Sequence, residues 1–489
     1  MPLTLAHPEL LRNANFIGGR WLAATDRTLA VTDPATGALI AQVPDSGANE
    51  ARAATDAAHA AFPAWRRTPA KQRAQIIKRW NDLVTANQDD LGRLISREQG
   101  KPLAEGKGEV AYAASYIEWF AEQATRINGE VIPAPAPGRR MFALKEPVGI
   151  VAAITPWNFP AAMIARKIAP ALAAGCTVVC KPAEDTPLTS LALVALAEQA
   201  GVPPGVLNIV TASRERTPEV VDSWLDDPRV RKITFTGSTP VGKHLARRSA
   251  DTLKKLSLEL GGNAPFIVFE DADLDAAIDG LMAAKFRNGG QTCVCPNRVF
   301  IQDAVHDAFA ERLVARVAAL QVGPATEASS QIGPMINERA VEKIERHVQD
   351  AVARGARILT GGVRLPALGP NYFAPTVLTN ADATMACACE ETFGPITPLT
   401  RFQDEGEVIA QANNTPFGLA AYFYSQDIRR VWRIADALET GIVAINEGAI
   451  AAEAAPFGGV KDSGYGREGS VHGLEDYLHT KYVCQGQLD

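Results

Sequence analysis

Two cysteines in a glycine-rich segment are the residues with the clearest chemical potential in this sequence. Cys293 and Cys295 lie on a bend between a helix-like run over 276–286 and a strand-like run over 298–302. A cysteine on such a bend can lie at the floor of a cleft, where backbone N–H groups could stabilise the oxyanion formed when its sulfur attacks a carbonyl. Simple packing is the alternative, because free cysteine is among the most buried residue types. The segment alone does not decide between them.

A carboxylate and an amide occupy places where each could take part in such a reaction. Glu259 ends an apolar run and precedes two glycines, and burying a carboxylate there is costly unless it is paired or used. Burial could raise its pKa towards neutrality, as a general base requires. Asn158 lies between two prolines, and this rigid placement suits an oxyanion donor, although an asparagine in a turn is usually structural.

Two strand ends carry residues that could bind a nucleotide. Gly237 follows a strand and opens a helix, where the backbone can approach a phosphate and the helix N-terminus favours negative charge. The spacing is not Gly-x-Gly-x-x-Gly, so the usual dinucleotide fingerprint is absent, and a simple turn is the alternative. Lys181 and Glu184 follow another strand and could hold the hydroxyls of a ribose, where an acidic group would repel a 2′-phosphate. A surface ion pair is the alternative for these two.

The elements that must position these residues alternate between strands and helices. Helices are expected to fill the intervals between apolar strands at 148–154, 177–180, 206–211, 230–235 and 253–258. This alternation predicts a parallel sheet that is covered on both faces and binds ligands beyond the carboxyl ends of its strands. A second alternating unit, expected from about Pro265 to Ala449, contains the cysteine segment.

The flanking segments predict supporting elements. Residues 15–45 read as short strands with turns, and helices over 71–87 and 109–126 follow. The second helix carries an aromatic stripe that we expect to pack against a neighbouring domain: Tyr112, Tyr116, Trp119 and Phe120. Residues 128–145 predict a protruding hairpin, with which the alternating segment 477–485 could pair. An exposed strand edge of this kind invites another subunit.

Composition bounds the class of protein. A chain of 489 residues is too long for one ordinary core, so two or three domains are expected. The net charge of −6 is small and dispersed, which argues against nucleic-acid and membrane partners. The N-terminus lacks a signal-peptide pattern, and seven cysteines, an odd number, favour a reducing cytoplasm over a disulfide framework. The Cys and His spacings do not suit zinc, so no metal is expected.

Seven motifs together resemble the aldehyde dehydrogenase superfamily and cover nearly the whole chain in the family's order. They are Pro156-Trp157-Asn158-Phe159-Pro160, Lys181-Pro182-Ala183-Glu184, Phe235-Thr236-Gly237-Ser238, Leu258-Glu259-Leu260-Gly261-Gly262, Gly290-Gln291-Thr292-Cys293, Glu390-Glu391-Thr392-Phe393-Gly394-Pro395 and Pro456-Phe457-Gly458-Gly459. Within the family, the segments around Cys293 and Lys181 look most like succinate-semialdehyde dehydrogenases, as does Gly464-Tyr465-Gly466-Arg467-Glu468-Gly469.

The resemblance implies an α/β fold of the aldehyde dehydrogenase type. A Rossmann-type dinucleotide-binding domain would comprise 1–126 and 146–258, and an α/β catalytic domain would comprise 259–465. A small β oligomerisation arm would comprise 127–145 and 466–489. The family assembles as homodimers or homotetramers, so a homo-oligomer is expected.

The resemblance also implies roles for single residues. Cys293 would attack the aldehyde to give a thiohemiacetal, Asn158 and the Cys293 N–H would hold the oxyanion, and Glu259 would activate the water that hydrolyses the thioester. NAD would bind through a set of residues from several motifs: Thr155, Trp157, Lys181, Glu184, Gly237, Ser238, Glu391 and Phe393. Glu184 favours NAD, although some relatives with this residue also use NADP.

The substrate implied by the resemblance is a small ω-semialdehyde. Arg166 and Arg287 match arginines that bind the far carboxylate in the subfamily, and Phe457 would also contact the substrate. Surface arginines on helices are the alternative for the first two. The subfamily usually has a hydroxyl residue where this chain has Ala451, so glutarate semialdehyde is an alternative to succinate semialdehyde.

Three further hypotheses remain open at this point. Cys293 and Cys295 could close into a strained, reducible disulfide that switches activity off, or Cys295 could simply pack. A general aldehyde dehydrogenase or a CoA-acylating, acyl-transferring cysteine enzyme is the first functional alternative, although the latter needs no general base such as Glu259. A catalytically silent protein on the same fold is the second.

Overall fold

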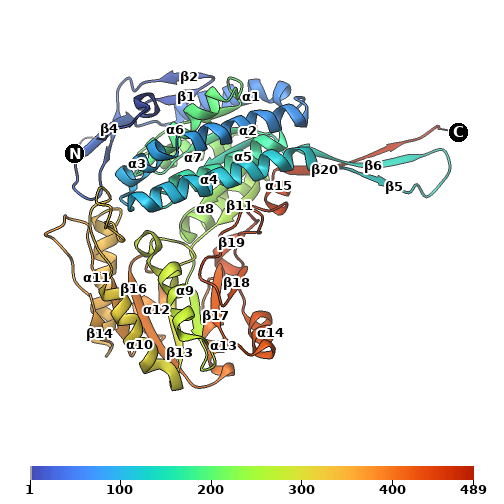
Figure 1. The fold of residues 1–489 in the computed structure, drawn as a ribbon. Helices are drawn as coiled ribbons and strands as arrows, with labels where there is room; N and C mark the ends of the chain where they lie inside the picture. Colours follow the sequence, from blue (N-terminus) through green and yellow to red (C-terminus); the bar gives the residue numbers. More distant parts are fainter. Residues whose placement is uncertain (1–2, 489) are drawn as a thin grey trace.

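The computed structural model describes residues 3–488, with two large sheets, the helices around them and a projecting arm (Figure 1). The first sheet has the strand order β19-β11-β10-β7-β8-β9-β1-β2. Its parallel centre comprises β7 (Ile150–Ile154), β8 (Thr177–Lys181), β9 (Leu207–Ile209), β10 (Val230–Thr236) and β11 (Lys255–Glu259). Antiparallel strands form its edges: β1 (Asn15–Ile17), β2 (Arg20–Leu22) and β19 (Gly464–Tyr465).

Helices cover both faces of this sheet, as the sequence predicts. Val151 and Ala153 of β7 pack with one group of helices, whereas Ile150 and Ala152 pack with the other, because successive side chains of a strand point to opposite faces. The first group is α2 (Ala70–Ala86), α3 (Gln88–Gln99), α4 (Leu103–Gln123), α5 (Pro160–Ala174) and α6 (Pro187–Gln199). The second group is α1 (Ala48–Trp65), α7 (Thr217–Asp226) and α8 (Thr239–Ser249).

The second sheet has the order β14-β15-β16-β13-β12-β17-β18 and is parallel except for β14. Its strands are β12 (Ala264–Val268), β13 (Pro296–Gln302), β14 (Arg357–Thr360), β15 (Thr376–Thr379), β16 (Ile396–Phe402), β17 (Ala420–Tyr424) and β18 (Ile442–Ile445). Its helices are α9 (Leu274–Phe286), α10 (Asp303–Ala318), α11 (Glu338–Ala353), α12 (Ala386–Cys389), α13 (Glu405–Asn413) and α14 (Ile428–Ala437). The second alternating unit expected from the sequence is therefore present.

A three-stranded arm projects from the body of the protein (Figure 1). It comprises β5 (Glu130–Ile132), β6 (Arg140–Pro147) and β20 (Leu478–Gln485). β20 pairs with β6 along its whole length, from Leu478 opposite Pro147 to Gln485 opposite Arg140. The predicted pairing of the C-terminal segment with the hairpin is confirmed. A separate pair, β3 (Thr28–Thr32) and β4 (Leu39–Pro44), precedes α1.

The strand expected over 253–258 begins two residues later, at Lys255. Leu253 has a φ of 49° and is 86 % exposed, so it ends a short 3-10 turn and points away from the core. A leucine in the left-handed region is unusual, and its hydrophobicity misleads a pattern-based prediction. The far end of the strand matters more for function, because β11 ends at Glu259.

Candidate functional site

The cysteine segment lies on an irregular turn between α9 and β13. Three consecutive residues adopt positive φ values: Asn288 at 52°, Gly289 at 62° and Gly290 at 78°. A Cβ on Gly290 would lie 2.3 Å from the carbonyl oxygen of Gly394, so only glycine fits at this crossing of two loops. The turn delivers Cys293 to a partly exposed position at the junction of the two sheets.

Asn158 is fixed to the same turn by hydrogen bonds. Its Nδ2 donates to the carbonyl of Gln291 at 3.2 Å, and its own carbonyl accepts from Asn288 Nδ2 at 3.0 Å. Lys101 Nζ also donates to the Asn158 carbonyl, at 2.8 Å, and forms a buried ion pair with Glu109. The amide beside the thiol is therefore rigid, as an oxyanion donor needs to be.

A cavity of about 320 Å³ joins the thiol to the carboxyl end of the first sheet. It is lined by residues that the sequence reasoning named as catalytic or cofactor-binding: Trp157, Asn158, Gly237, Ser238, Cys293, Glu391 and Phe393. Three cations that it did not name also line the cavity: Arg214, Arg339 and Lys343. They lie in loops or on α11 outside the recognised motifs, so the sequence alone gave no signal for them.

Burial shapes the acidities around this cavity. Burial raises the pKa of the Cys293 thiol to about 12, although the nearby Arg166 charge opposes the shift. Burial also raises the pKa of Glu391 to about 7, opposed by a hydrogen bond from the Gly262 N–H and by the Lys343 ammonium. Thiolate formation therefore needs either a base or a further positive charge close to the sulfur.

Glu259 lies at the end of β11, where its backbone is paired with Thr236 on one side and Gly464 on the other. It is 3 % exposed, and neither carboxyl oxygen has a hydrogen-bond partner among residues 3–488. Burial raises its pKa well above the usual value, and the like charge of Glu468 adds to the shift. An unpaired buried carboxyl group of this kind can take up a proton near neutral pH.

Glu468 is a functional candidate that the sequence reasoning did not single out. It forms buried ion pairs with Arg166, at 2.7 Å from Nε, and with Lys167. Lys167 Nζ also donates to Thr236 Oγ1 at 2.5 Å, next to the end of β11. Although burial opposes it, the two cations hold the pKa of Glu468 below its usual value. The only sequence signal was the glycine-rich stretch 464–469, noted there for its resemblance alone.

Lys181 and Glu184 meet at the carboxyl end of β8. Their side chains are 3.4 Å apart, and Glu184 is the more exposed of the two, at 28 %. Burial lowers the pKa of Lys181, and the charge of Glu184 opposes the shift. Thr155 donates its N–H to the Lys181 carbonyl at 3.2 Å, and its buried hydroxyl has no partner among the described residues.

These features fit a dinucleotide. Gly237 and Ser238 place the N-terminus of α8 at the cavity, which suits a phosphate group. Lys181 and Glu184 offer a donor and an acceptor for ribose hydroxyls at the end of β8, two strands from β10, and the unpartnered Thr155 hydroxyl offers another polar contact.

Arg166, Arg287 and Phe457 gather beside aromatic rings of α4 and of the loop before α5. The Arg166 guanidinium carbon lies 4.1 Å from the Phe457 ring centroid and 5.2 Å from that of Tyr116. Arg287 lies 4.7 Å from the Phe159 ring centroid. The expectation that the aromatic stripe of α4 serves packing alone is therefore incomplete. Phe120 is fully buried, but two tyrosines of the stripe contact the arginines.

Cys295 lies apart from the cavity. It is 1 % exposed, and its Sγ approaches the carbonyl oxygens of Lys285 at 3.7 Å and Pro296 at 3.9 Å. Both Cys293 and Cys295 are free thiols in this structure. A disulfide between them stays a prediction.

Two further features bear on the class of protein. Within residues 3–488, no cluster of three or more His, Cys, Asp or Glu side chains could hold a metal ion. In the same range, no helix combines the length and the apolar character that crossing a bilayer requires.

A thiol and a fixed amide on a cavity between two α/β units, with an unpaired buried carboxyl group at the end of β11 that acts on the thiol, are the features of a cysteine-dependent enzyme. The aldehyde dehydrogenase family model matches residues 21–483, and the chain belongs to this family. It is therefore an oxidoreductase, and the expected enzyme class and fold class are confirmed.

Curated relatives are similar along their full length. The chain is 55 % identical to a 3-sulfolactaldehyde dehydrogenase of Pseudomonas putida, covering 100 % of both chains. It is 55 % identical to a glutarate-semialdehyde dehydrogenase of the same species, covering 99 % of both. It is 54 % identical to the succinate-semialdehyde dehydrogenase [NADP(+)] of Escherichia coli, covering 99 % and 100 %. The crystal structure of a succinate-semialdehyde dehydrogenase from Burkholderia pseudomallei matches with a TM-score of 0.96 and 57 % identity, covering 98 % of this chain and 99 % of that one.

Proposed function

We propose that this protein oxidises a small aldehyde with a remote anionic group, succinate semialdehyde or glutarate semialdehyde, to the corresponding dicarboxylate with NAD(P)+. The observation that carries the proposal is the position of Cys293 and Asn158 on one cavity with Gly237, Ser238 and Glu391. The charge of Arg166 opposes the rise in the pKa of Cys293, so this arginine lies within reach of a short substrate bound to the thiol.

In the proposed reaction, Cys293 loses its proton and its thiolate attacks the aldehyde carbon, and Asn158 Nδ2 and the Cys293 N–H stabilise the oxyanion of the thiohemiacetal. Bound NAD(P)+ would accept the hydride. Glu259 takes a proton from water, which attacks the resulting thioester and releases the acid from the sulfur. Lys181 and Glu184 would hold the adenosine ribose, together with Thr155, and Glu391, Phe393 and Trp157 would hold the nicotinamide end.

NAD is the expected cofactor because Glu184, partly exposed beside Lys181, would repel a 2′-phosphate. NADP remains the alternative, since Arg214 and Arg339 also line the cavity and could attract that phosphate. Comparing kcat/KM for the two cofactors with one aldehyde decides between them.

A panel of aldehydes tests the substrate class. Succinate semialdehyde and glutarate semialdehyde should give a higher kcat/KM than butanal and pentanal, which have the same chain lengths without the charge. 3-Sulfolactaldehyde belongs in the panel because a relative with 55 % identity carries that name. A protein that oxidises the neutral aldehydes equally well contradicts the anionic substrate class. Production of an acyl-CoA instead of the free acid would favour the acyl-transfer alternative.

We further propose the division of labour implied by the resemblance: a dinucleotide-binding domain over 1–126 and 146–258, a catalytic domain over 259–465, and an oligomerisation arm over 127–145 and 466–489. The arm exposes Val131 at 81 % and Tyr482 at 57 %, and β18 is an edge strand of the second sheet, so both offer surfaces to another copy. A cytoplasmic homodimer or homotetramer is proposed on this basis.

A redox switch at Cys293 and Cys295 is proposed as a separate property. Two free thiols two residues apart could form a strained, easily reduced bond. Peroxide should then inactivate the protein and dithiothreitol restore it, whereas the Cys295→Ala variant should not regain activity in this way.

A further inference from the structure

One of the two arginines beside the site is largely committed to another part of the protein. Arg166 is 1 % exposed, its Nε pairs with Glu468 at 2.7 Å, and its Nη1 donates to the Tyr112 hydroxyl at 3.4 Å. Its Nη2 has no hydrogen-bond partner among residues 3–488. A buried guanidinium with one unused nitrogen can accept one further anion contact, but Glu468 already balances its charge.

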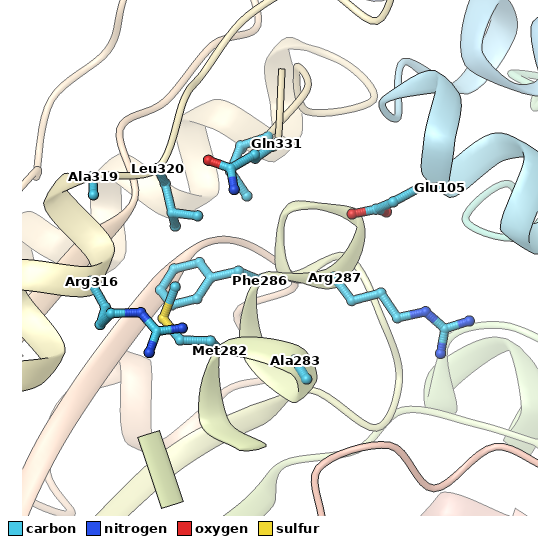
Figure 2. Close-up of a pocket in the computed structure, with 10 residues that line it drawn as sticks. Glu105, Met282, Ala283, Phe286, Arg287, Arg316, Ala319, Leu320 and Gln331 are labelled. Atoms are coloured by element: carbon cyan, nitrogen blue, oxygen red, sulfur yellow. The ribbon is translucent and has the colours of Figure 1, made fainter. Parts of the chain in front are cut away.

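Arg287 is not held by an ion pair of this kind, although its charge acts on the buried carboxyl group of Glu105. Its side chain forms no ion pair within residues 3–488, and its guanidinium carbon lies 5.7 Å from the Tyr112 ring centroid. Arg287 lines a surface cavity with Met282 and Arg316, and Figure 2 shows its guanidinium directed away from both of these side chains. It therefore contributes an available charge on the side of α4, where Tyr112 lies.

Tyr112 is the residue that joins the two arginines. Its hydroxyl oxygen accepts from Arg166 Nη1, and its ring lies beside the Arg287 guanidinium. Its hydroxyl also lies 3.3 Å from that of Tyr116, whose ring meets it edge-on at 89°. The Tyr116 hydroxyl in turn donates to the Ala452 carbonyl at 3.3 Å, so Tyr116 offers its oxygen as the acceptor for the Tyr112 proton.

We propose that Tyr112 is a specificity-determining residue, which donates its phenolic proton to the remote anionic group of the substrate between Arg287 and Arg166 Nη2. The proposal rests on the function proposed above and identifies the Tyr112 hydroxyl as a group that recognises the substrate's negative charge. Among residues 3–488 the phenolic proton of Tyr112 has only the long contact with Tyr116, at 3.3 Å. An anion is a better acceptor than a neutral phenol, because a hydrogen bond to a charged group is about twice as strong.

The Tyr116 hydroxyl lies near the segment around Ala451, which has no hydroxyl side chain of its own. Ala451 and its alanine neighbours offer no side-chain donor, whereas Tyr116 ties that segment to α4 through the Ala452 carbonyl. The tyrosine hydroxyls of α4 thus lie next to the place where the subfamily resemblance led us to expect a hydroxyl residue.

Steady-state kinetics of the full-length Tyr112→Phe variant test this proposal with succinate semialdehyde and butanal, which differ in the charged end. The ratio of their kcat/KM values should fall by about tenfold or more, mainly through a higher KM for succinate semialdehyde. The affinity for succinate, measured as inhibition of butanal oxidation, should fall in parallel. Ser115→Ala is the matched control, because Ser115 loses a hydroxyl on the same helix that bonds only the Tyr112 carbonyl.

The outcomes separate the two proposals. Tyr112→Phe that lowers kcat/KM equally for both aldehydes, or leaves the ratio unchanged, overturns the role of Tyr112 while the proposed function stands. A similar fall in the ratio for Ser115→Ala would assign the effect to the helix rather than to the phenol, and would also overturn it. A wild-type protein that prefers neither succinate semialdehyde over butanal nor glutarate semialdehyde over pentanal contradicts the proposed function itself.

Discussion

Two buried carboxyl groups, Glu259 and Glu468, lie near each other and near Arg166, and their surroundings give them different states. Glu468 is held by Arg166 and Lys167, which favour its charged form. The Glu259 carboxyl has no hydrogen-bond partner among residues 3–488 and lies near the negative charge of Glu468, so Glu259 has the higher affinity for a proton. This difference makes Glu259 the better candidate for moving a proton to and from water.

Glu259→Gln should separate oxidation from hydrolysis. The variant keeps the shape of the side chain but cannot accept a proton, so it should release one burst of NADH per site and then stall. Steady-state turnover should fall by about a hundredfold or more. Glu270→Gln, at an exposed carboxyl group just after β12, is the control and should behave as wild type. Unchanged turnover of Glu259→Gln would refute its role as the base.

Glu391 predicts a pH dependence of cofactor binding. Burial raises its pKa to about 7, so it loses its charge as the pH falls through that value. A protonated carboxyl group accepts ribose hydrogen bonds less well, and the KM for NAD+ should therefore rise below pH 7 and level off above it. Initial rates from pH 5.5 to 9 measure this.

Glu390→Gln provides the matched control for Glu391→Gln. The pKa of Glu390 is held near 2, chiefly by Arg346, so it does not titrate in this range. Glu391→Gln should flatten the pH profile of KM, whereas Glu390→Gln should leave its inflection near pH 7. A profile that keeps its inflection without Glu391 contradicts the assignment.

At the scale of elements, the site depends on loops at strand ends more than on the strands themselves. The Cys293 turn crosses the Gly394 loop with no room for a side chain at Gly290. Glu391 and Phe393 belong to that second loop, so the turn that carries the thiol and the loop that carries the expected nicotinamide contacts support each other.

Gly290→Ala should disturb both loops together. The substitution forces a Cβ against the Gly394 carbonyl at a φ of 78°, a strain of about 1–3 kcal/mol that should lower both Tm and kcat. Gly37→Ala is matched in φ, at 73°, but its Cβ would meet nothing within 4 Å. Thermal unfolding should therefore show a smaller loss for Gly37→Ala, with activity unchanged. Equal effects would assign the damage to backbone conformation alone.

Much of this arrangement is visible in the sequence, for reasons that can be traced to single residues. Val151 and Ala153 face one helical layer while Ile150 and Ala152 face the other, so the strand is apolar throughout and easily recognised. Glycine-rich strand ends likewise mark Gly237 and the Cys293 turn. Glu468 and Tyr112 could not be assigned this way, because a charged residue in a loop and a tyrosine on a helix usually serve the surface or the core.

At the scale of the whole molecule, the arm leaves large apolar side chains in contact with solvent. Val131 is 81 % exposed on β5, far from the cores of the two sheets (Figure 1). Isolated exposed apolar residues are common, but an extended ribbon that carries them serves best as a contact for another chain.

Val131→Lys should weaken that contact. A charge placed in an apolar interface costs desolvation energy, so the particle mass measured by light scattering after size-exclusion chromatography should fall towards that of a single chain. Leu253→Lys is the control, because Leu253 is equally apolar and is 86 % exposed on the body of the protein. A mass that is unchanged by Val131→Lys, or lowered equally by both, would argue against the arm as the oligomer contact.

The pairing of β6 with β20 determines how late in translation the arm can form. Lys145 leaves the ribosome 335 residues before its partner Thr480, a delay of about 20–70 s at ordinary rates of translation. Until Thr480 is made, one edge of the hairpin in the nascent chain lacks its third strand. Glu468, which pairs with Arg166, is synthesised only shortly before Thr480. The newly made polypeptide can therefore complete the arm and the ion pair behind the catalytic centre only after the segment 468–480 has been synthesised.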